Sequence, residues 1–213
     1  MDAKTHWEHV YRAKGPEQLS WFQAEAKLSR ELIAQFAPAR DSRVIDVGAG
    51  ASTLVDGLLA DGYSQVTVLD LSVAALDLAR ERLGADAKRV EWLEGDVLTA
   101  ALPAASADVW HDRAVFHFLT DPMDRFRYVE QVRRVVRPHG TVLVATFADD
   151  GPTRCSGLEV RRYSPSELHN EFGHDFRLRE SRREEHHTPW GTLQAFTYCV
   201  CSYEPAVDVR SAA

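Results

Sequence analysis

From about residue 40 onward, the sequence alternates short runs rich in valine, isoleucine and leucine with longer segments of helical periodicity. The short runs are typical of strands buried on both faces, and the longer segments place apolar residues three and four positions apart, as amphipathic helices do. The predicted strands are 43–47, 65–69, 89–93, 107–111 and 140–147, and the predicted helices between them are 53–60, 74–83 and 122–136. Such alternation predicts an α/β fold with a parallel sheet and helices on both of its faces.

The pattern changes after residue 147. Residues 148–157 are polar and include glycine and proline, which is typical of a loop, and 164–172 has the spacing of a short helix. Two further strands are predicted over 176–184 and 194–203, on either side of the turn residues 188–192. We therefore expect a terminal antiparallel pair that is added to the edge of the parallel sheet.

The chain has 213 residues, of which 45% are hydrophobic, and this size fits one core and one domain. Its 25 lysines and arginines against 32 aspartates and glutamates give a net charge of −7, which argues against a nucleic-acid partner. Cys155, Cys199 and Cys201 form neither an even disulfide set nor a zinc pattern. The first residues lack an apolar leader and no later run has the length to span a membrane, so the sequence predicts a cytoplasmic protein without a membrane partner.

A glycine-containing turn follows the first predicted strand, with Asp46, Gly48 and Gly50 at alternate positions. Ligands of open α/β sheets bind beyond the carboxyl ends of the strands, and glycines there let the backbone approach a ligand closely. A dinucleotide favours a third glycine at the position of Thr53, and Asp46 would repel a pyrophosphate whereas it suits an ammonium group. The turn therefore indicates a polar ligand other than a dinucleotide.

Acidic residues also end or follow the second and third predicted strands. Asp70 ends the second strand, where a carboxylate can accept hydrogen bonds from both hydroxyls of a ribose. Asp96 follows the third strand, where it can accept from an adenine amino group while Val97 lies against the ring. Each residue alone also fits ordinary turn chemistry, so the prediction of a nucleoside site depends on their occurring in this order.

This ordered set resembles the class I S-adenosylmethionine-dependent methyltransferases, over residues 43–147 and in the reversed final strand. The resemblance implies a three-layer, Rossmann-like fold whose seven-stranded, mostly parallel sheet has an antiparallel final strand. It also implies S-adenosylmethionine as the cofactor, with the glycine turn at the methionine moiety, Asp70 at the ribose, and Asp96 with Val97 at the adenine. The implied cofactor residues are Trp7, Tyr11, Trp21, Asp46, Gly48, Ala49, Gly50, Asp70, Leu71, Ser72, Asp96, Val97, Asp112 and Arg113.

Residues 110–118 follow the fourth predicted strand, close to where a reacting methyl group would lie. The segment is similar to a motif of small thiopurine and thiol methyltransferases, in which an Asp-Arg pair precedes a histidine. His117 is therefore the candidate general base, since an imidazole titrates near neutral pH, although it also fits a packed residue at a helix start. An alternative role for Asp112 and Arg113 is to pair with each other and orient the loop.

The N-terminal region is unusually aromatic. Trp7 and Tyr11 are four residues apart and share a helical face, which is the spacing of a core stripe. In similar methyltransferases such a pair, followed by a Ser-Trp segment, covers the methionine end of the cofactor, so the resemblance implies a lid that includes Trp7, Tyr11 and Trp21. The single domain would then comprise a helical lid (1–40), a cofactor-binding half (41–147), a substrate-side loop and terminal hairpin (148–203) and a tail (204–213).

Segments after the fifth strand and the last hairpin would complete an acceptor pocket. Cys155 beside Arg154 is either a thiol of lowered pKa or a small buried filler. His186 and His187 do not share a metal-binding spacing with Cys155, so no metal is predicted. The candidate substrate residues are Phe147, Arg154, Cys155, His186 and Trp190, with Arg162, His187 and Gln194 as further candidates.

The sequence predicts methyl transfer by in-line displacement to a small-molecule acceptor. Catalysis of such a displacement can come largely from aligning the nucleophile and excluding water. A compact, acidic chain without an appended recognition domain favours a small acceptor. Two alternatives remain: the N-terminal pattern also resembles lysine methyltransferases that modify single protein targets, and the domain could bind the cofactor without turnover.

Overall fold

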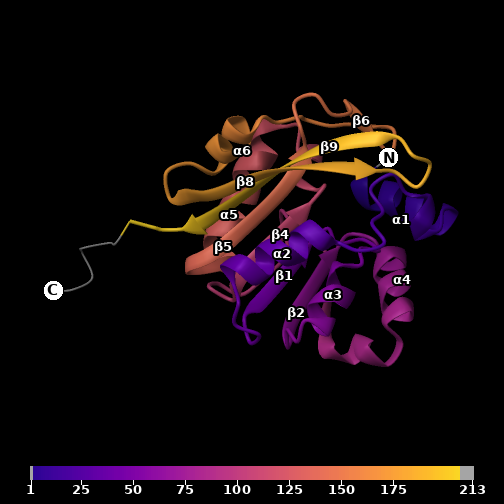
Figure 1. Ribbon diagram of the computed structural model, residues 1–213, viewed down its shortest axis with the longest axis horizontal. Helices are drawn as coiled ribbons and strands as arrows, with labels where there is room; N and C mark the ends of the chain where they lie inside the picture. The colour runs from indigo at the N-terminus through magenta and orange to yellow at the C-terminus, as the bar shows by residue number, and fades with distance from the viewer. Residues whose placement is uncertain (1, 207–213) are drawn as a thin grey trace.

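The computed structural model describes residues 2–206, and its centre is a seven-stranded sheet of order β3-β2-β1-β4-β5-β9-β8 (Figure 1). The strands are β1 (Arg43–Val47), β2 (Gln65–Asp70), β3 (Val90–Glu94), β4 (Ala107–Arg113), β5 (Val136–Phe147), β8 (Phe176–His187) and β9 (Leu193–Tyr203). β1 to β5 are parallel, and β9 is antiparallel to both β5 and β8. The predicted mostly parallel sheet with an antiparallel final strand is confirmed. Residues 207–213 of the predicted tail lie outside the described residues.

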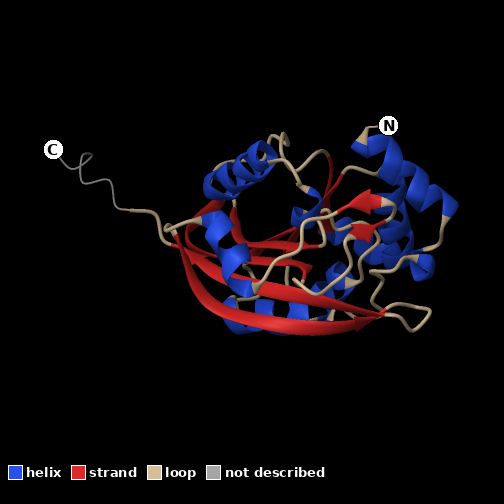
Figure 2. Ribbon diagram, turned by 90° about the horizontal axis from the view of Figure 1, so that it is seen from above, coloured by secondary structure: helices blue, strands red, loops and turns tan. Residues whose placement is uncertain are grey.

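Helices cover both faces of the sheet (Figure 2). The helices are α1 (Ala3–Ala13), η1 (Pro16–Gln18), α2 (Lys27–Phe36), α3 (Leu54–Ala60), α4 (Val73–Leu83), η2 (Gly84–Arg89), η3 (Phe116–Phe118), α5 (Pro122–Val135) and α6 (Pro165–Phe172). α2, α3 and α4 contribute to the apolar core on one face, and α5 and α6 to the core on the other. α1 packs beside α4 through a third, smaller apolar cluster. Within residues 2–206, no helix has the length and apolarity needed to cross a membrane.

β5 begins at Val136 rather than at residue 140, so the predicted start of this strand is wrong. α5 passes directly into the strand, and the pairing with β4 shifts register between Ala107 and Val109. His139 takes a left-handed conformation with φ of 65° beside this irregularity. The strand thus accommodates proline and glycine residues that ordinarily indicate an interruption, because the irregular stretch lies at the start of β5, before its pairing with β9 begins at Thr141.

A small hairpin lies in the predicted loop 148–157 and just beyond it. It consists of β6 (Arg154–Cys155) and β7 (Leu158–Glu159), which pair antiparallel. The two residues between them, Ser156 and Gly157, have φ values of 49° and 80°. Two positive φ angles are the requirement of a tight hairpin turn whose twist matches its strands. The hairpin fixes the positions of Cys155 and Leu158.

A buried polar cluster stabilises the turn that follows β4. The Asp112 carboxylate accepts hydrogen bonds from the N–H groups of Val115 and Phe116, at 2.9 and 3.1 Å, and from the Tyr128 hydroxyl at 2.6 Å. The Trp110 indole N–H donates in turn to the Tyr128 hydroxyl at 2.9 Å. Burial nevertheless raises the pKa of Asp112 to about 6, so this carboxylate depends on its donors.

The variant Tyr128→Phe is expected to lower the free energy of unfolding by about 1–3 kcal/mol, because Asp112 and Trp110 each lose a buried hydrogen-bond partner. Urea denaturation followed by circular dichroism measures the change. Tyr203→Phe is the control, since Tyr203 is half-buried and its ring stacks on Phe176, a contact that phenylalanine keeps, and it should change stability by less than about 0.5 kcal/mol. Equal losses in the two variants would contradict the role of the buried cluster.

Candidate functional site

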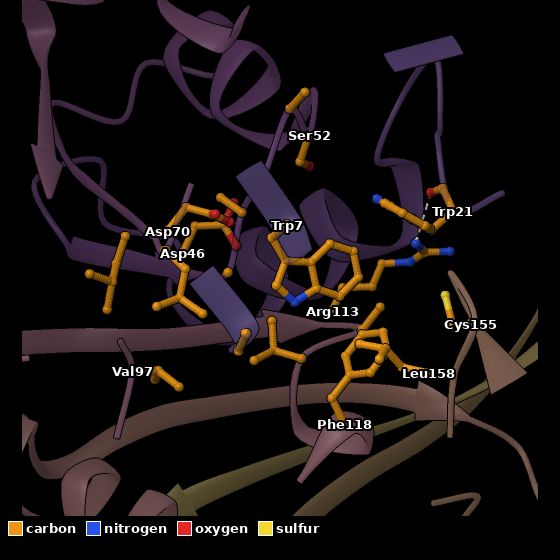
Figure 3. Close-up of a pocket in the computed structure, with 18 of the residues that line it drawn as sticks. Trp7, Trp21, Asp46, Ser52, Asp70, Val97, Arg113, Phe118, Cys155 and Leu158 are labelled. Atoms are coloured by element: carbon orange, nitrogen blue, oxygen red, sulfur yellow. Dashed lines mark hydrogen bonds between the residues drawn. The ribbon is translucent and has the colours of Figure 1, made fainter. Parts of the chain in front are cut away.

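A cavity of about 490 Å³ lies at the carboxyl ends of β1, β2, β3 and β4, beside α1 (Figure 3). The residues that end or follow each of these strands line it. Figure 3 shows Asp46 and Asp70 toward one end and Phe118 and Cys155 toward the other, with Trp7 between them. We call the first the carboxylate end (Asp46, Asp70, Asp96) and the second the aromatic end (Trp7, Trp21, Phe118, Cys155, Leu158).

Asp70 is held by backbone donors. Its Oδ2 accepts from the N–H of Gly50 at 2.7 Å and its Oδ1 from the N–H of Ser72 at 2.8 Å. Burial raises the pKa of Asp70 to about 6, although these hydrogen bonds oppose the shift. Asp70 and Leu71 line the cavity. Gly50 and Ser72 are not among the lining residues, and they contribute to the site by donating to the Asp70 carboxylate. Free lone pairs on both carboxylate oxygens can still accept from a ligand.

The two glycines of the turn are required by backbone conformation and by space. Gly48 and Gly50 have φ values of +58° and +56°. A Cβ atom at Gly48 would lie 2.0 Å from Val115 Cγ2, and one at Gly50 would lie 2.0 Å from the Tyr11 hydroxyl. Glycine at these two positions therefore lets the neighbouring side chains approach the turn more closely than a residue with a Cβ atom would permit.

Asp46 has one satisfied and one unsatisfied oxygen. Its Oδ1 lies 2.7 Å from His111 Nδ1, while its buried Oδ2 has no hydrogen-bond partner among the described residues. A buried carboxylate oxygen without a donor is costly, and both Asp46 and His111 line the cavity. Asp46 and Asp70 are also close enough for the charge of Asp46 to raise the pKa of Asp70. This end of the cavity therefore suits a ligand with a cationic group and hydroxyl donors.

Asp96 and Val97 complete the carboxylate end beyond β3. Both line the cavity, as do Gly95 and Leu98. Asp96 Oδ1 accepts from the N–H of Leu98 at 2.8 Å, which leaves its second oxygen for another donor. The arrangement combines one half-buried carboxylate with apolar side chains, as a flat heterocycle with an amino group would need.

Polar contacts hold α1 over the carboxylate end. Glu8 Oε2 accepts from the Ser72 hydroxyl at 2.7 Å and from the N–H of Ala74 at 3.2 Å, at the start of α4. Hydrogen bonds from Ser72 and then Arg12 lower the pKa of Glu8 to about 2, so this carboxylate stays ionised. Lys4 donates to Glu94 at the end of β3. The helix thus has one anchor at the start of α4 and another at the end of β3.

Aromatic rings from α1 and from the segment after it meet at the aromatic end. The Trp7 ring lies edge-to-face with Trp21 and Phe118, with centroids 5.7 and 5.0 Å away, and Trp21 also lies edge-to-face with Tyr11. Trp7, Tyr11 and Trp21 all line the cavity, and the structure therefore brings the predicted lid residues together. Phe118 and Leu158 also line it but were not among the sequence-predicted site residues.

Arg113 joins the lid to the sheet. Its guanidinium donates to the Trp21 carbonyl at 3.2 Å, to Glu184 Oε2 at 2.9 Å and to the Tyr198 hydroxyl at 3.0 Å (Figure 3 shows the first). The alternative role predicted for Asp112 and Arg113, a pair with each other, is wrong, because successive side chains of a strand point to opposite faces. Arg113 lines the cavity, while Asp112 lies in the buried polar cluster on the other face.

His117, the candidate base, is not brought to the cavity lining. Its ring is fully buried against Phe147, and its Nδ1 accepts from the N–H of Phe147 at 3.3 Å. Burial, and then the charge of Arg113, lower the pKa of His117 to about 3, so the imidazole stays neutral. The structure accordingly favours the alternative, a packed residue at the start of the short helix η3.

Among the other substrate candidates, only Cys155 lines the cavity. Burial raises the pKa of its thiol to about 11, which fits a buried filler and not a reactive thiolate. His186 donates to the Ser20 carbonyl at 2.7 Å, and Arg154 faces Glu159 on the surface. Trp190 is 61% exposed in the turn between β8 and β9. Over residues 2–206, no group of three or more His, Cys, Asp or Glu side chains is arranged to hold a metal ion.

Comparison with known proteins supports the sequence pattern. Residues 44–140 match a family described as "Methyltransferase domain". An uncharacterized methyltransferase of Mycobacterium bovis is 32% identical over 131 residues, which are 60% of this chain and 60% of that protein. The human EEF1A lysine methyltransferase 2 is 26% identical over 199 residues, which are 84% of this chain and 76% of that protein.

A bovine eEF1A lysine and N-terminal methyltransferase is 27% identical over 139 residues, which are 65% of this chain. This chain spans only 19% of the length of the bovine relative and 60% of the mycobacterial one. The similarity therefore covers only part of each of these two proteins.

Two solved structures share the fold. One, from work on the conversion of a disulfide bond into a thioacetal group during echinomycin biosynthesis, has a TM-score of 0.74 at 18% identity and covers 94% of this chain and 93% of that one. The other is the Burkholderia thailandensis 1,6-didemethyltoxoflavin-N1-methyltransferase with bound 1,6-didemethyltoxoflavin and S-adenosylhomocysteine. It has a TM-score of 0.67 at 20% identity and covers 92% of this chain and 81% of that one.

Affinity for S-adenosylhomocysteine is expected to fall as the pH drops through about 6. The pKa of Asp70 is raised to about 6, and only above it is the carboxylate ionised and the stronger acceptor of ribose hydroxyls. Calorimetric titrations between about pH 5 and 7.5 measure the dependence. Asp70→Asn should weaken binding by about 1–3 kcal/mol at neutral pH and remove this dependence.

Asp112→Asn is the control, because the pKa of Asp112 is raised to about 6 as well but its side chain lies outside the cavity lining. This variant should keep the pH dependence of the wild-type protein. If the pH dependence of the affinity disappears in Asp112→Asn and persists in Asp70→Asn, Asp70 is not the ribose acceptor.

Proposed function

We propose, since the chain belongs to the class I S-adenosylmethionine-dependent methyltransferases, that it transfers the cofactor's methyl group to a small-molecule acceptor at the aromatic end of the cavity. The observation that carries the proposal is the continuity of this cavity. One space connects the buried carboxylates to the aromatic rings, so a cofactor at one end would present its methyl group toward the other.

The carboxylate end fits S-adenosylmethionine by the chemistry of its groups. Asp46 Oδ2 is buried and unpartnered among the described residues, and it suits the amino group of the methionine moiety. Asp70 suits the ribose hydroxyls, and Asp96 with Val97 suits the adenine. When bound, the cofactor supplies an electrophilic methyl group on a sulfonium.

The aromatic end would align the acceptor and exclude water. Trp7, Trp21 and Phe118 form an apolar wall over this part of the cavity. With the cofactor bound, a lone pair of the acceptor would form a bond to the methyl carbon as the carbon–sulfur bond breaks with its electron pair on sulfur, and any proton of the acceptor would leave to solvent. Alignment and desolvation of the acceptor promote such a step without a catalytic side chain. We assign neither the neutral, enclosed His117 nor the protonated Cys155 as a base.

The proposal is tested by incubating the protein with methyl-labelled S-adenosylmethionine and a panel of thiols, amines, phenols and carboxylates. We expect label in at least one small molecule, with S-adenosylhomocysteine released in equal amount. The cavity favours a small acceptor, because aromatic side chains of the lid line the end at which it would lie. Label that enters only protein bands of a lysate would overturn the small-molecule acceptor.

A protein lysine is the second candidate acceptor. The observation in its favour is that the similarity to the human EEF1A lysine methyltransferase 2 extends over 84% of this chain. The same labelled cofactor, incubated with purified elongation factor 1A and with the lysate, tests this candidate, and amino-acid analysis would identify methyl-lysine. Intact cofactor binding without label in either fraction would leave a non-catalytic cofactor-binding domain.

Trp7→Ala is expected to lower the rate of methyl transfer at least about tenfold, because it opens the roof of the aromatic end to water and loosens the alignment of the acceptor. Steady-state kinetics with the best acceptor measure the change. Trp190→Ala is the matched control, since Trp190 is 61% exposed and is not one of the lining residues, and it should change the rate less than about twofold. Equal rates for Trp7→Ala and the wild-type protein would place the acceptor elsewhere.

A further inference from the structure

We propose that His111 is a positioning residue that sets the Asp46 carboxylate to receive the amino group of the cofactor's methionine moiety, with Ser29 holding the imidazole in place. The proposal rests on the proposed function, since it concerns how the same cavity recognises its cofactor. His111 is not among the residues that the sequence pattern singled out. Its role emerges from the contacts between β1, β4 and α2.

The sheet puts His111 directly beside Asp46. The two residues are partners in the parallel pairing of β1 with β4, so their side chains leave the same face of the sheet. Both side chains are 3% exposed, and His111 Nδ1 lies 2.7 Å from Asp46 Oδ1. A carboxylate offers only acceptors, so the Nδ1–H of His111 must be the donor.

Ser29 fixes the other side of the imidazole ring. Its hydroxyl lies 2.8 Å from His111 Nε2, and Ser29 is itself buried within α2. The Ser29 hydroxyl also lies 3.4 Å from the Tyr198 hydroxyl on β9. With Nδ1–H directed at Asp46, the Ser29 hydroxyl can donate to an unprotonated Nε2 or accept from a protonated one, so it holds the imidazole in either state. With partners on both nitrogens, the ring cannot turn away from Asp46.

These contacts give the two carboxylate oxygens of Asp46 different roles. Oδ1 is occupied by His111, and Oδ2 has no donor among the described residues although it is fully buried. Rotation of the carboxylate would break the bond to His111, so the unpartnered oxygen keeps one direction. Asp46 also lines the cavity, so this unpartnered oxygen is available to accept from a bound ligand. The arrangement suits one further donor of positive charge, which the amino group of the methionine moiety provides.

A comparison of the affinities for two ligands distinguishes this role from a general contribution of His111 to the fold. S-Adenosylhomocysteine carries the amino-acid part of the cofactor, whereas 5′-methylthioadenosine contains the adenosine and sulfur but no amino group. His111→Leu should weaken binding of S-adenosylhomocysteine by at least about tenfold and change binding of 5′-methylthioadenosine less than about twofold, both measured by calorimetry. Unchanged 5′-methylthioadenosine binding also shows that the variant is folded.

His111→Asn is the matched variant, because the asparagine side-chain amide can place an N–H near the position of Nδ1. It should retain S-adenosylhomocysteine binding to within about threefold. Equal losses for the two ligands in His111→Leu, an unchanged affinity for S-adenosylhomocysteine, or a loss in His111→Asn as large as in His111→Leu would each overturn the proposal. Failure of the wild-type protein to bind either ligand would instead overturn the proposed function.

Discussion

Two carboxylates, Asp46 and Asp70, are buried side by side where β1 and β2 end, and much of the surrounding structure serves to hold them. Within residues 2–206, neither is paired with a lysine or an arginine. Asp70 depends on the backbone N–H groups of the glycine turn and of the start of α4, and Asp46 depends on a histidine from the adjacent strand. An uncompensated charge in such a place costs several kcal/mol, so the cavity is preorganised for a ligand that brings donors and positive charge. The glycine turn and the parallel pairing of β1 with β4 both contribute to holding these carboxylates.

The lid is attached by a different kind of interaction. α1 contributes to a small apolar cluster, and its remaining anchors are polar contacts from Glu8 and Lys4 to the ends of strands or to the helix that follows. Opening this helix therefore breaks far fewer contacts than unfolding either core of the sheet. Segments with few buried contacts open at lower free-energy cost than the whole domain, which is a requirement for a cofactor that must enter and leave.

The sequence alone predicted the fold well, because buried parallel strands and amphipathic helices have distinct periodicities. It also predicted most of the residues at the carboxylate end, since each follows a strand and turn residues are recognisable locally. It could not predict His111, which reads as one more residue of a buried strand until β4 is placed against β1. For the same reason, the sequence could not decide between the two roles left open for His117, a general base or a packed residue. Its burial against Phe147 depends on a contact between distant segments, and spacing along the chain carries no signal for such a contact.

The polar groups of the site form one connected hydrogen-bond network, and this connection limits which substitutions its residues tolerate. From Asp46 the contacts run through His111 and Ser29 to Tyr198, at 2.7, 2.8 and 3.4 Å. Tyr198 accepts from Arg113, which donates to the carbonyl of Trp21 in the lid. The same set of buried hydrogen bonds thus joins the cofactor turn, α2, β9 and the lid. Substitutions within such a network are not additive, because each group orients the next. The carboxylate that faces the cofactor and the aromatic ring that covers it are therefore positioned by one structure.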